Sequence, residues 1–140
     1  MEKTYFALIL GASSGFGKEI ALTLAKDGVN IIGVHLDRAT TMPDVEKEIE
    51  EIRSYGVEAH FFNINAADPH KREDVLNTVA EIFKNKENST IKVIVHSLAF
   101  GTLRKFVSED GNDQINMKQM EMTVDVMAHS LVYWTQEVLK

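Results

Sequence analysis

The chain has 140 residues, of which 44% are hydrophobic, and a net charge of −6. This length supports one domain over residues 1–140 and is too short for two. The acidic balance argues against nucleic acid and anionic membranes as partners, because neither attracts such a surface. Cysteine is absent, which excludes disulfides, thiolate metal sites and Cys nucleophiles. No apolar run approaches the ~20 residues that span a bilayer, and the composition fits a cytoplasmic setting.

The first half of the chain alternates short apolar runs with amphipathic segments. Apolar runs predict strands at residues 5–10, 30–34 and 59–64. A helix is expected over residues 18–26, ended by Gly28. A second helix starts near residues 41–44, with Pro43 in its first turn. Its buried face should hold Val45, Ile49 and Ile52, beneath a charged face of Glu46, Lys47, Glu48, Glu50 and Glu51.

The second half continues the same alternation. Asp68 and Pro69 open a third helix as N-cap and first helical residue. Residues 84–90 are expected to form a polar loop, and residues 91–95 a fully apolar fourth strand. Residues 100–115 are irregular, and residues 117–139 form one long final helix. This βαβαβαβα order predicts an α/β fold: a Rossmann-like, doubly wound parallel sheet of four strands in the order 3-2-1-4, within three α/β/α layers.

A glycine-rich turn joins the first strand to the first helix. Gly11 lets the chain turn off the strand, Gly15 lets a pyrophosphate approach the backbone, and Gly17 lets the helix pack on the sheet. The helix start then presents N–H groups and a positive dipole end to the phosphates. Ser13, Ser14 and Phe16 complete this candidate cradle.

The motif Gly-Ala-Ser-Ser-Gly-Phe-Gly resembles the cofactor motif of short-chain dehydrogenases/reductases, although Leu10 stands where that family often has Thr. The resemblance implies adenine contacts at Asn65 and Ala66, where Asn65 replaces the usual Asp. It also implies contacts of Ser97 and Leu98 with the nicotinamide ribose. His96-Ser97-Leu98-Ala99 and the segment 125–132 look like the enoyl-acyl-carrier-protein reductase branch. The resemblance covers the whole chain, which corresponds to the N-terminal part of a full domain of that family.

The residue that reads the adenosine ribose should lie just past the second strand. Asp37 stands twenty residues after Gly17, the spacing at which an acid accepts from the ribose 2′-OH of NAD. Arg38 could instead pair with the 2′-phosphate of NADP. Both side chains could also be solvated loop charges. NAD and NADP therefore both stay open as the cofactor.

The Tyr and Lys that complete catalysis in the family have no counterpart here, because no Tyr-x3-Lys occurs. Tyr133 and Lys140 have the separation seen in enoyl reductases, but Tyr133 aligns with an earlier helix. The catalytic residues are therefore unknown, and no His pair has metal-ligand spacing. We expect the cofactor-binding part of an NAD(P)-dependent oxidoreductase acting on an enoyl or carbonyl substrate. The alternative is a nucleotide-binding or assembly module without turnover.

The final helix also bears on partners. Met120, Met127, Leu131, Trp134 and Val138 form an apolar stripe along residues 117–139. Exposed apolar helices usually find a partner. We expect a homo-oligomer through this helix, or a complementary chain that supplies the rest of the catalytic site.

Overall fold

The computed structural model describes residues 3–140 and contains one parallel four-stranded sheet in the order β3-β2-β1-β4. This order and the parallel pairing confirm the predicted α/β class. The strands are β1 (Thr4–Leu10), β2 (Asn30–His35), β3 (Ala59–Asn63) and β4 (Ser89–His96).

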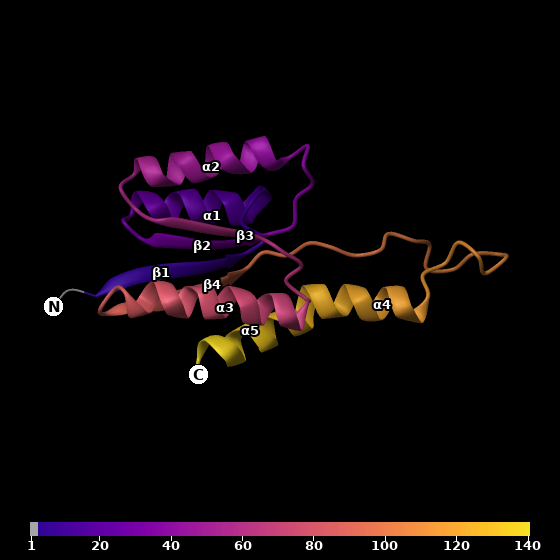
Figure 1. The fold of residues 1–140 in the computed structure, drawn as a ribbon. Coiled ribbons are helices and arrows are strands. Elements are labelled where there is room, and N and C mark those ends of the chain that lie inside the picture. The colour runs from indigo at the N-terminus through magenta and orange to yellow at the C-terminus, as the bar shows by residue number, and fades with distance from the viewer. Residues whose placement is uncertain (1–2) are drawn as a thin grey trace.

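Helices cover both faces of the sheet, as Figure 1 shows: α1 and α2 lie on one side, and α3 and α5 lie on the other. The predicted three layers are therefore confirmed. The helices are α1 (Gly15–Lys26), α2 (Met42–Ser54), α3 (Pro69–Lys84), α4 (Met117–Val124), the π-helical turn η1 (Asp125–His129) and α5 (Ser130–Val138). No helix within residues 3–140 combines the length and apolarity needed to cross a bilayer.

Strand β1 divides the core in two, because successive side chains of a strand point to opposite faces. Phe6, Leu8 and Leu10 pack in one cluster with Val75 of α3 and Trp134 of α5. The residues between them join a second cluster under α1 and α2, with Ala7 and Ile9 at its centre. Because all strand pairs are parallel, the carboxyl ends of the four strands lie at the same edge of the sheet.

The predicted boundaries shift in two places. Helix α1 begins at Gly15 rather than residue 18, because Ser14 is extended and can act as the N-cap. Strand β4 begins at Ser89, inside the predicted polar loop, because its backbone pairs with Thr4 of β1 whatever its side chains are. The expectation of a fully apolar fourth strand is also wrong. Lys92 and Val93 are exposed, and the Lys92 ammonium lies 4.3 Å from the centre of the Tyr5 ring.

The single final helix is replaced by α4, η1 and α5. A π-helical turn advances the chain by an extra residue, so it rotates the inward face of the helix. Val126, Ser130 and Trp134 point inward, whereas Met127 and Leu131 remain exposed. The predicted stripe is therefore split: Trp134 and Val138 pack on the core, and Met120, Met127 and Leu131 face outward.

Glu48 also differs from its expected place on the charged face of α2. Its side chain is buried with 1% exposure, and neither carboxylate oxygen has a hydrogen-bond partner within residues 3–140. The reason is helical geometry, since Glu48 is three residues after Val45 and four before Ile52, both of which are buried. Burial raises the pKa of its carboxyl to about 7. The positive charge of Lys18 opposes this shift, and the negative charges of Asp37, Glu51 and Glu19 add to it.

Candidate functional site

The glycine turn lies at the carboxyl end of β1 and runs directly into α1. Gly11 has φ +86° and Gly15 has φ +53°, a backbone region that favours glycine. A Cβ at Gly11 would overlap the Ser97 carbonyl, and one at Gly17 would overlap the Gly11 carbonyl. Space around Gly15 is open. Gly11 and Gly17 thus allow close packing, and Gly15 leaves the helix start accessible.

The first turn of α1 receives no capping hydrogen bond from the side chain of its N-cap residue. Ser14 is the N-cap residue and makes no side-chain capping hydrogen bond. The first N–H groups of any helix lack partners within the helix, and the dipole places partial positive charge there. The open space at Gly15 therefore offers N–H donors to an anion. Such a cradle fits the pyrophosphate of a dinucleotide.

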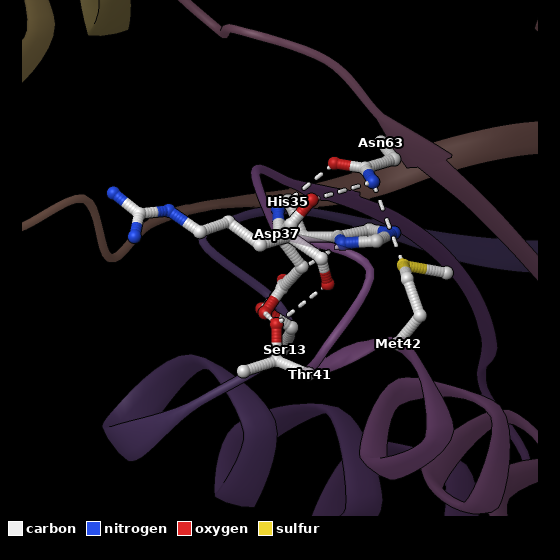
Figure 2. Close-up of polar contacts among 7 residues, drawn as sticks. Ser13, His35, Asp37, Thr41, Met42 and Asn63 are labelled. Atoms are coloured by element: carbon white, nitrogen blue, oxygen red, sulfur yellow. Dashed lines mark hydrogen bonds and ion pairs between the residues drawn. The ribbon is translucent and has the colours of Figure 1, made fainter.

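Asp37, just beyond β2, is the centre of a polar cluster that Figure 2 shows. Its Oδ2 accepts a hydrogen bond of 2.5 Å from Ser13 Oγ and lies 2.9 Å from Nδ1 of His35. Its Oδ1 accepts from Thr41 Oγ1 at 2.8 Å. The Asn63 amide exchanges two hydrogen bonds with the Asp37 backbone, at 2.9 and 3.0 Å. The cluster ties the glycine turn to the ends of β2 and β3.

The electrostatics of this cluster follow from its donors. Burial opposes ionisation of Asp37, but hydrogen bonds from Ser13, Thr41 and His35 outweigh it and hold the pKa of the carboxyl below its ordinary value. The Asp37 side chain is 16% exposed. Arg38 is exposed and makes no hydrogen bond or ion pair through its side chain within residues 3–140. A fixed anion and a free cation thus stand side by side.

Two further corners come from the ends of β3 and β4. Asn65 Oδ1 accepts from the Ala67 N–H at 3.0 Å, and the Ala66 carbonyl accepts from the buried Trp134 indole N–H at 2.9 Å. The Ser97 N–H donates to the Leu10 carbonyl at 2.8 Å, which places Ser97 beside the glycine turn.

These segments surround one cleft of about 1300 Å³. All residues predicted to bind the cofactor line it except Gly17, which packs beneath the turn: Gly11, Ser13, Ser14, Gly15, Phe16, Asp37, Arg38, Asn65, Ala66, Ser97 and Leu98. A smaller cavity of about 470 Å³ lies among α2, β3 and α3, and none of these residues lines it. Within residues 3–140, no group of three or more His, Asp or Glu side chains could hold a metal ion.

The sequence analysis did not predict one wall of the cleft. It also did not predict the hydrogen bonds from His35 and Thr41 that hold Asp37. Lys118, Met122 and Val126 of α4 and η1 line the cleft, and so does His70 at the start of α3. The helix residues lie 22 to 30 positions beyond the end of β4 and carry no recognisable motif. Only the order of strands and helices could have predicted these residues. In such a fold, each connection after a strand begins at the carboxyl edge of the sheet, where the cleft lies.

The family follows from comparison with known proteins, since the sequence profile of the short-chain dehydrogenases matches residues 5–140. The chain belongs to this family. Within it, the 3-oxoacyl-[acyl-carrier-protein] reductase FabG of Staphylococcus aureus is 34% identical over 83 residues, which is 59% of this chain and 32% of the relative. An uncharacterized short-chain type dehydrogenase/reductase, y4eK, of Sinorhizobium fredii is 27% identical over 100% of this chain and 47% of its own length.

Solved structures of short-chain dehydrogenases/reductases have the same fold as this chain. A 3-oxoacyl-[acyl-carrier protein] reductase from Brucella melitensis superposes with a TM-score of 0.76 at 22% identity, covering 99% of this chain and 50% of the other. A putative short-chain dehydrogenase/reductase from Sinorhizobium meliloti gives 0.75 at 21% identity, covering 99% and 55%. The chain therefore spans between a third and about half of these relatives.

Proposed function

We propose that the chain is the cofactor-binding part of an NAD(P)-dependent oxidoreductase. The observation that carries this proposal is the convergence of the turns after β1, β2, β3 and β4 on one cleft, with the open helix start at Gly15 among them. Membership of the short-chain dehydrogenase family supports it.

The turn after β1 would hold the pyrophosphate. N–H groups at the start of α1 would donate to its oxygens, and the hydroxyls of Ser13 and Ser14 would add donors. Gly11 and Gly17 would keep the turn tight, as their close backbone contacts require. Phe16 is 84% exposed beside the turn and would cover the bound phosphates with an apolar face.

The adenosine half would lie toward β2 and β3. Asp37 would accept from a ribose 2′-OH, and Arg38 would pair with a 2′-phosphate. Asn65 Oδ1 uses one lone pair on the Ala67 N–H, and its second can accept from the adenine amino group. Ala66 would pack beside the base. These roles make the relative affinity for NADH and NADPH a balance between Asp37 and Arg38.

The nicotinamide half would lie toward β4, with its ribose near Ser97 and Leu98. When bound, the nicotinamide supplies a hydride for an enoyl or carbonyl substrate. The likeness of residues 96–99 to enoyl reductases favours the enoyl substrate, whereas the FabG relatives are named as 3-oxoacyl reductases. This chain would bind and orient the cofactor. No Tyr-x3-Lys pair that could donate a proton to the substrate occurs within residues 1–140.

The alternative is a nucleotide-binding module without turnover. Consumption of NADH or NADPH with enoyl and 3-oxoacyl thioesters would separate the two functions. Turnover by the chain alone would contradict the alternative. Dinucleotide binding without turnover, even with a complementary chain added, would support it.

Nicotinamide fluorescence during titration with NADH and NADPH tests the cleft itself. We expect saturable binding of at least one of them, and more than tenfold weaker binding by Gly15→Asp, because its carboxylate would repel the phosphates. Gly28→Asp is the matched control, since Gly28 also has positive φ and open space but does not line the cleft. A folded chain that binds neither dinucleotide would contradict the proposal.

A further inference from the structure

His96 and Ser130 make a side-chain contact between distant parts of the chain. His96 is the last residue of β4 and Ser130 is the first of α5. Nε2 of His96 lies 2.8 Å from Oγ of Ser130. Ser130 is fully buried, and His96 is half-buried. Neither side chain belongs to the glycine turn or to the Asp37 cluster.

The direction of this hydrogen bond follows from the valence of the hydroxyl. Ser130 has one hydroxyl hydrogen and donates it to the Val126 carbonyl at 2.7 Å. Its oxygen is left to accept, so His96 donates from Nε2–H. Burial lowers the pKa of His96, and the weaker opposing effect comes from backbone hydrogen bonds at His96 and Val126. The neutral ring with its proton on Nε2 therefore makes the contact at neutral pH.

The contact anchors one end of an irregular segment that forms a wall of the cleft. Residues 97–100 follow His96 without regular structure, and all four line the cleft. At the far end, the Thr102 N–H donates to Thr123 Oγ1 at 3.2 Å, and a Cβ at Gly101 would come within 2.7 Å of Thr123 Cγ2. Both ends of the wall are thus fixed to the α4–η1–α5 segment.

The same contact reaches a second part of the cleft lining. Val126, whose carbonyl accepts from Ser130, lies in the π-helical turn and lines the cleft. A π-helical turn leaves backbone groups outside the α-helical pattern, and such turns often occur at functional sites. The His96–Ser130–Val126 chain therefore sets the separation of two cleft walls.

We propose that His96 and Ser130 are a positioning pair that holds the nicotinamide end of the cleft, by fixing residues 97–100 against the π-helical turn at Val126. This inference rests on the proposed function. It concerns only one half of the dinucleotide, because the sheet order puts β4 and the adenosine corner after β2 and β3 on opposite sides of the turn after β1.

Two ligands separate this role from general structural support. ADP fills the adenosine and phosphate parts of the cleft, whereas NADH or NADPH also needs the β4 side. We expect His96→Leu and Ser130→Ala to weaken binding of the preferred dinucleotide at least fivefold in calorimetric titrations, with ADP affinity unchanged within twofold. The double variant should be no weaker than either single variant, because both remove the same contact.

The conservative variant His96→Gln keeps an N–H donor near the position of Nε2 and should recover most of the dinucleotide affinity. Ser130→Ala keeps a good helix former in α5, so the test does not depend on the folding of the His96 variants. Equal losses for ADP and dinucleotide, or wild-type affinity in Ser130→Ala, would overturn the positioning role alone. A wild-type chain that binds neither ligand would overturn the proposed function as well.

Discussion

Two carboxylates, Asp37 before α2 and Glu48 within it, show how hydrogen-bond donors affect the ionisation of an acid in the protein. Asp37 has three side-chain donors and keeps its charge beside the cleft. Among the described residues Glu48 has no hydrogen-bond donor, and burial raises the pKa of its carboxyl to about 7. The two differ both in donors and in burial, since the Asp37 side chain is 16% exposed and Glu48 is 1% exposed.

Glu48 should make the stability of the protein fall with rising pH. Its carboxyl has a higher pKa in the folded protein than the ordinary value of 4.5, so its unfavourable effect is absent below pH 4.5 and grows as the pH rises through about 7. We expect Glu48→Gln to raise the free energy of unfolding at pH 8 by on the order of 2 kcal/mol. Urea unfolding at pH 5 and pH 8 measures this difference.

The exposed neighbour Glu50 provides the control for that measurement. Glu50→Gln removes the same charge from the same helix and should leave the pH dependence of the free energy of unfolding as in the wild type. An equal stability gain for Glu48→Gln at both pH values would contradict the role of its ionisation.

Asp37 and Arg38 should shift cofactor preference in opposite directions. Removing the fixed negative charge with Asp37→Asn should raise affinity for NADPH relative to NADH, because repulsion of a 2′-phosphate is lost. Arg38→Ala should lower the same ratio, by roughly tenfold, because a charge-assisted pair with phosphate is lost. Parallel titrations with NADH and NADPH give both ratios. Shifts of the two ratios in the same direction would contradict these assignments.

The sequence placed Asp37 just past the second strand, where it lines the cleft, and its contact with the cofactor stays a prediction; the sequence misplaced Glu48. The spacing from Gly17 fixed the position of Asp37 in a βαβ unit, where backbone geometry is common to many proteins. Glu48 lies on the buried face by helical phase, but its charge argued for solvent. Whether Glu48 is buried or exposed depends on how α2 packs on α1 and the sheet. The sequence of α2 alone does not contain that information.

At the scale of elements, strands were more predictable than the final helix. Continuous apolar runs identified β1, β2 and β3 to within one residue, because burial on both faces requires them. The π-helical turn is followed by Ser130, which contacts His96 from 34 residues earlier, and by Trp134, which is inserted into the core. Such distant contacts cannot be predicted from a local sequence pattern. One extra residue in a helical turn also rotates every later side chain about the helix axis.

Trp134 should contribute to stability through its hydrogen bond as well as its packing. Trp134→Phe leaves the buried Ala66 carbonyl without its donor, and we expect a loss of about 1–3 kcal/mol in the free energy of unfolding. Circular dichroism should follow the unfolding, because Trp134 is the single tryptophan. Tyr133→Phe is the control and should change the free energy of unfolding little, since Tyr133 is exposed and its hydroxyl has no partner within residues 3–140.

At the scale of the whole molecule, α4, η1 and α5 expose apolar side chains that do not line the cleft. Five of them are between 38% and 51% exposed: Met120, Val124, Met127, Leu131 and Val132. An exposed face of this kind is typical of a protein interface. The sequence predicted a contact surface at residues 117–139, although the π-helical turn changed which residues form it.

We expect the chain to self-associate through this face. Sedimentation should give a mass above the 15.7 kDa of one chain at micromolar concentrations. Leu131→Glu should shift the equilibrium toward the monomer, because it places a charge in the apolar surface. Leu103→Glu is the control, since Leu103 is 99% exposed in the segment between β4 and α4, which projects from the sheet in Figure 1. A monomer at all concentrations would contradict this expectation.

The position of β4 at the edge of the sheet affects how a purified chain of residues 1–140 aggregates during storage. Within residues 3–140, β4 pairs with β1 alone, so its other row of N–H and C=O groups can accept a strand from another molecule. Lys92 places a positive charge on this strand, and such charges slow the stacking of strands into fibrils. Salt screens that charge. Concentrated stocks should therefore form thioflavin-positive aggregates sooner at high ionic strength than at low.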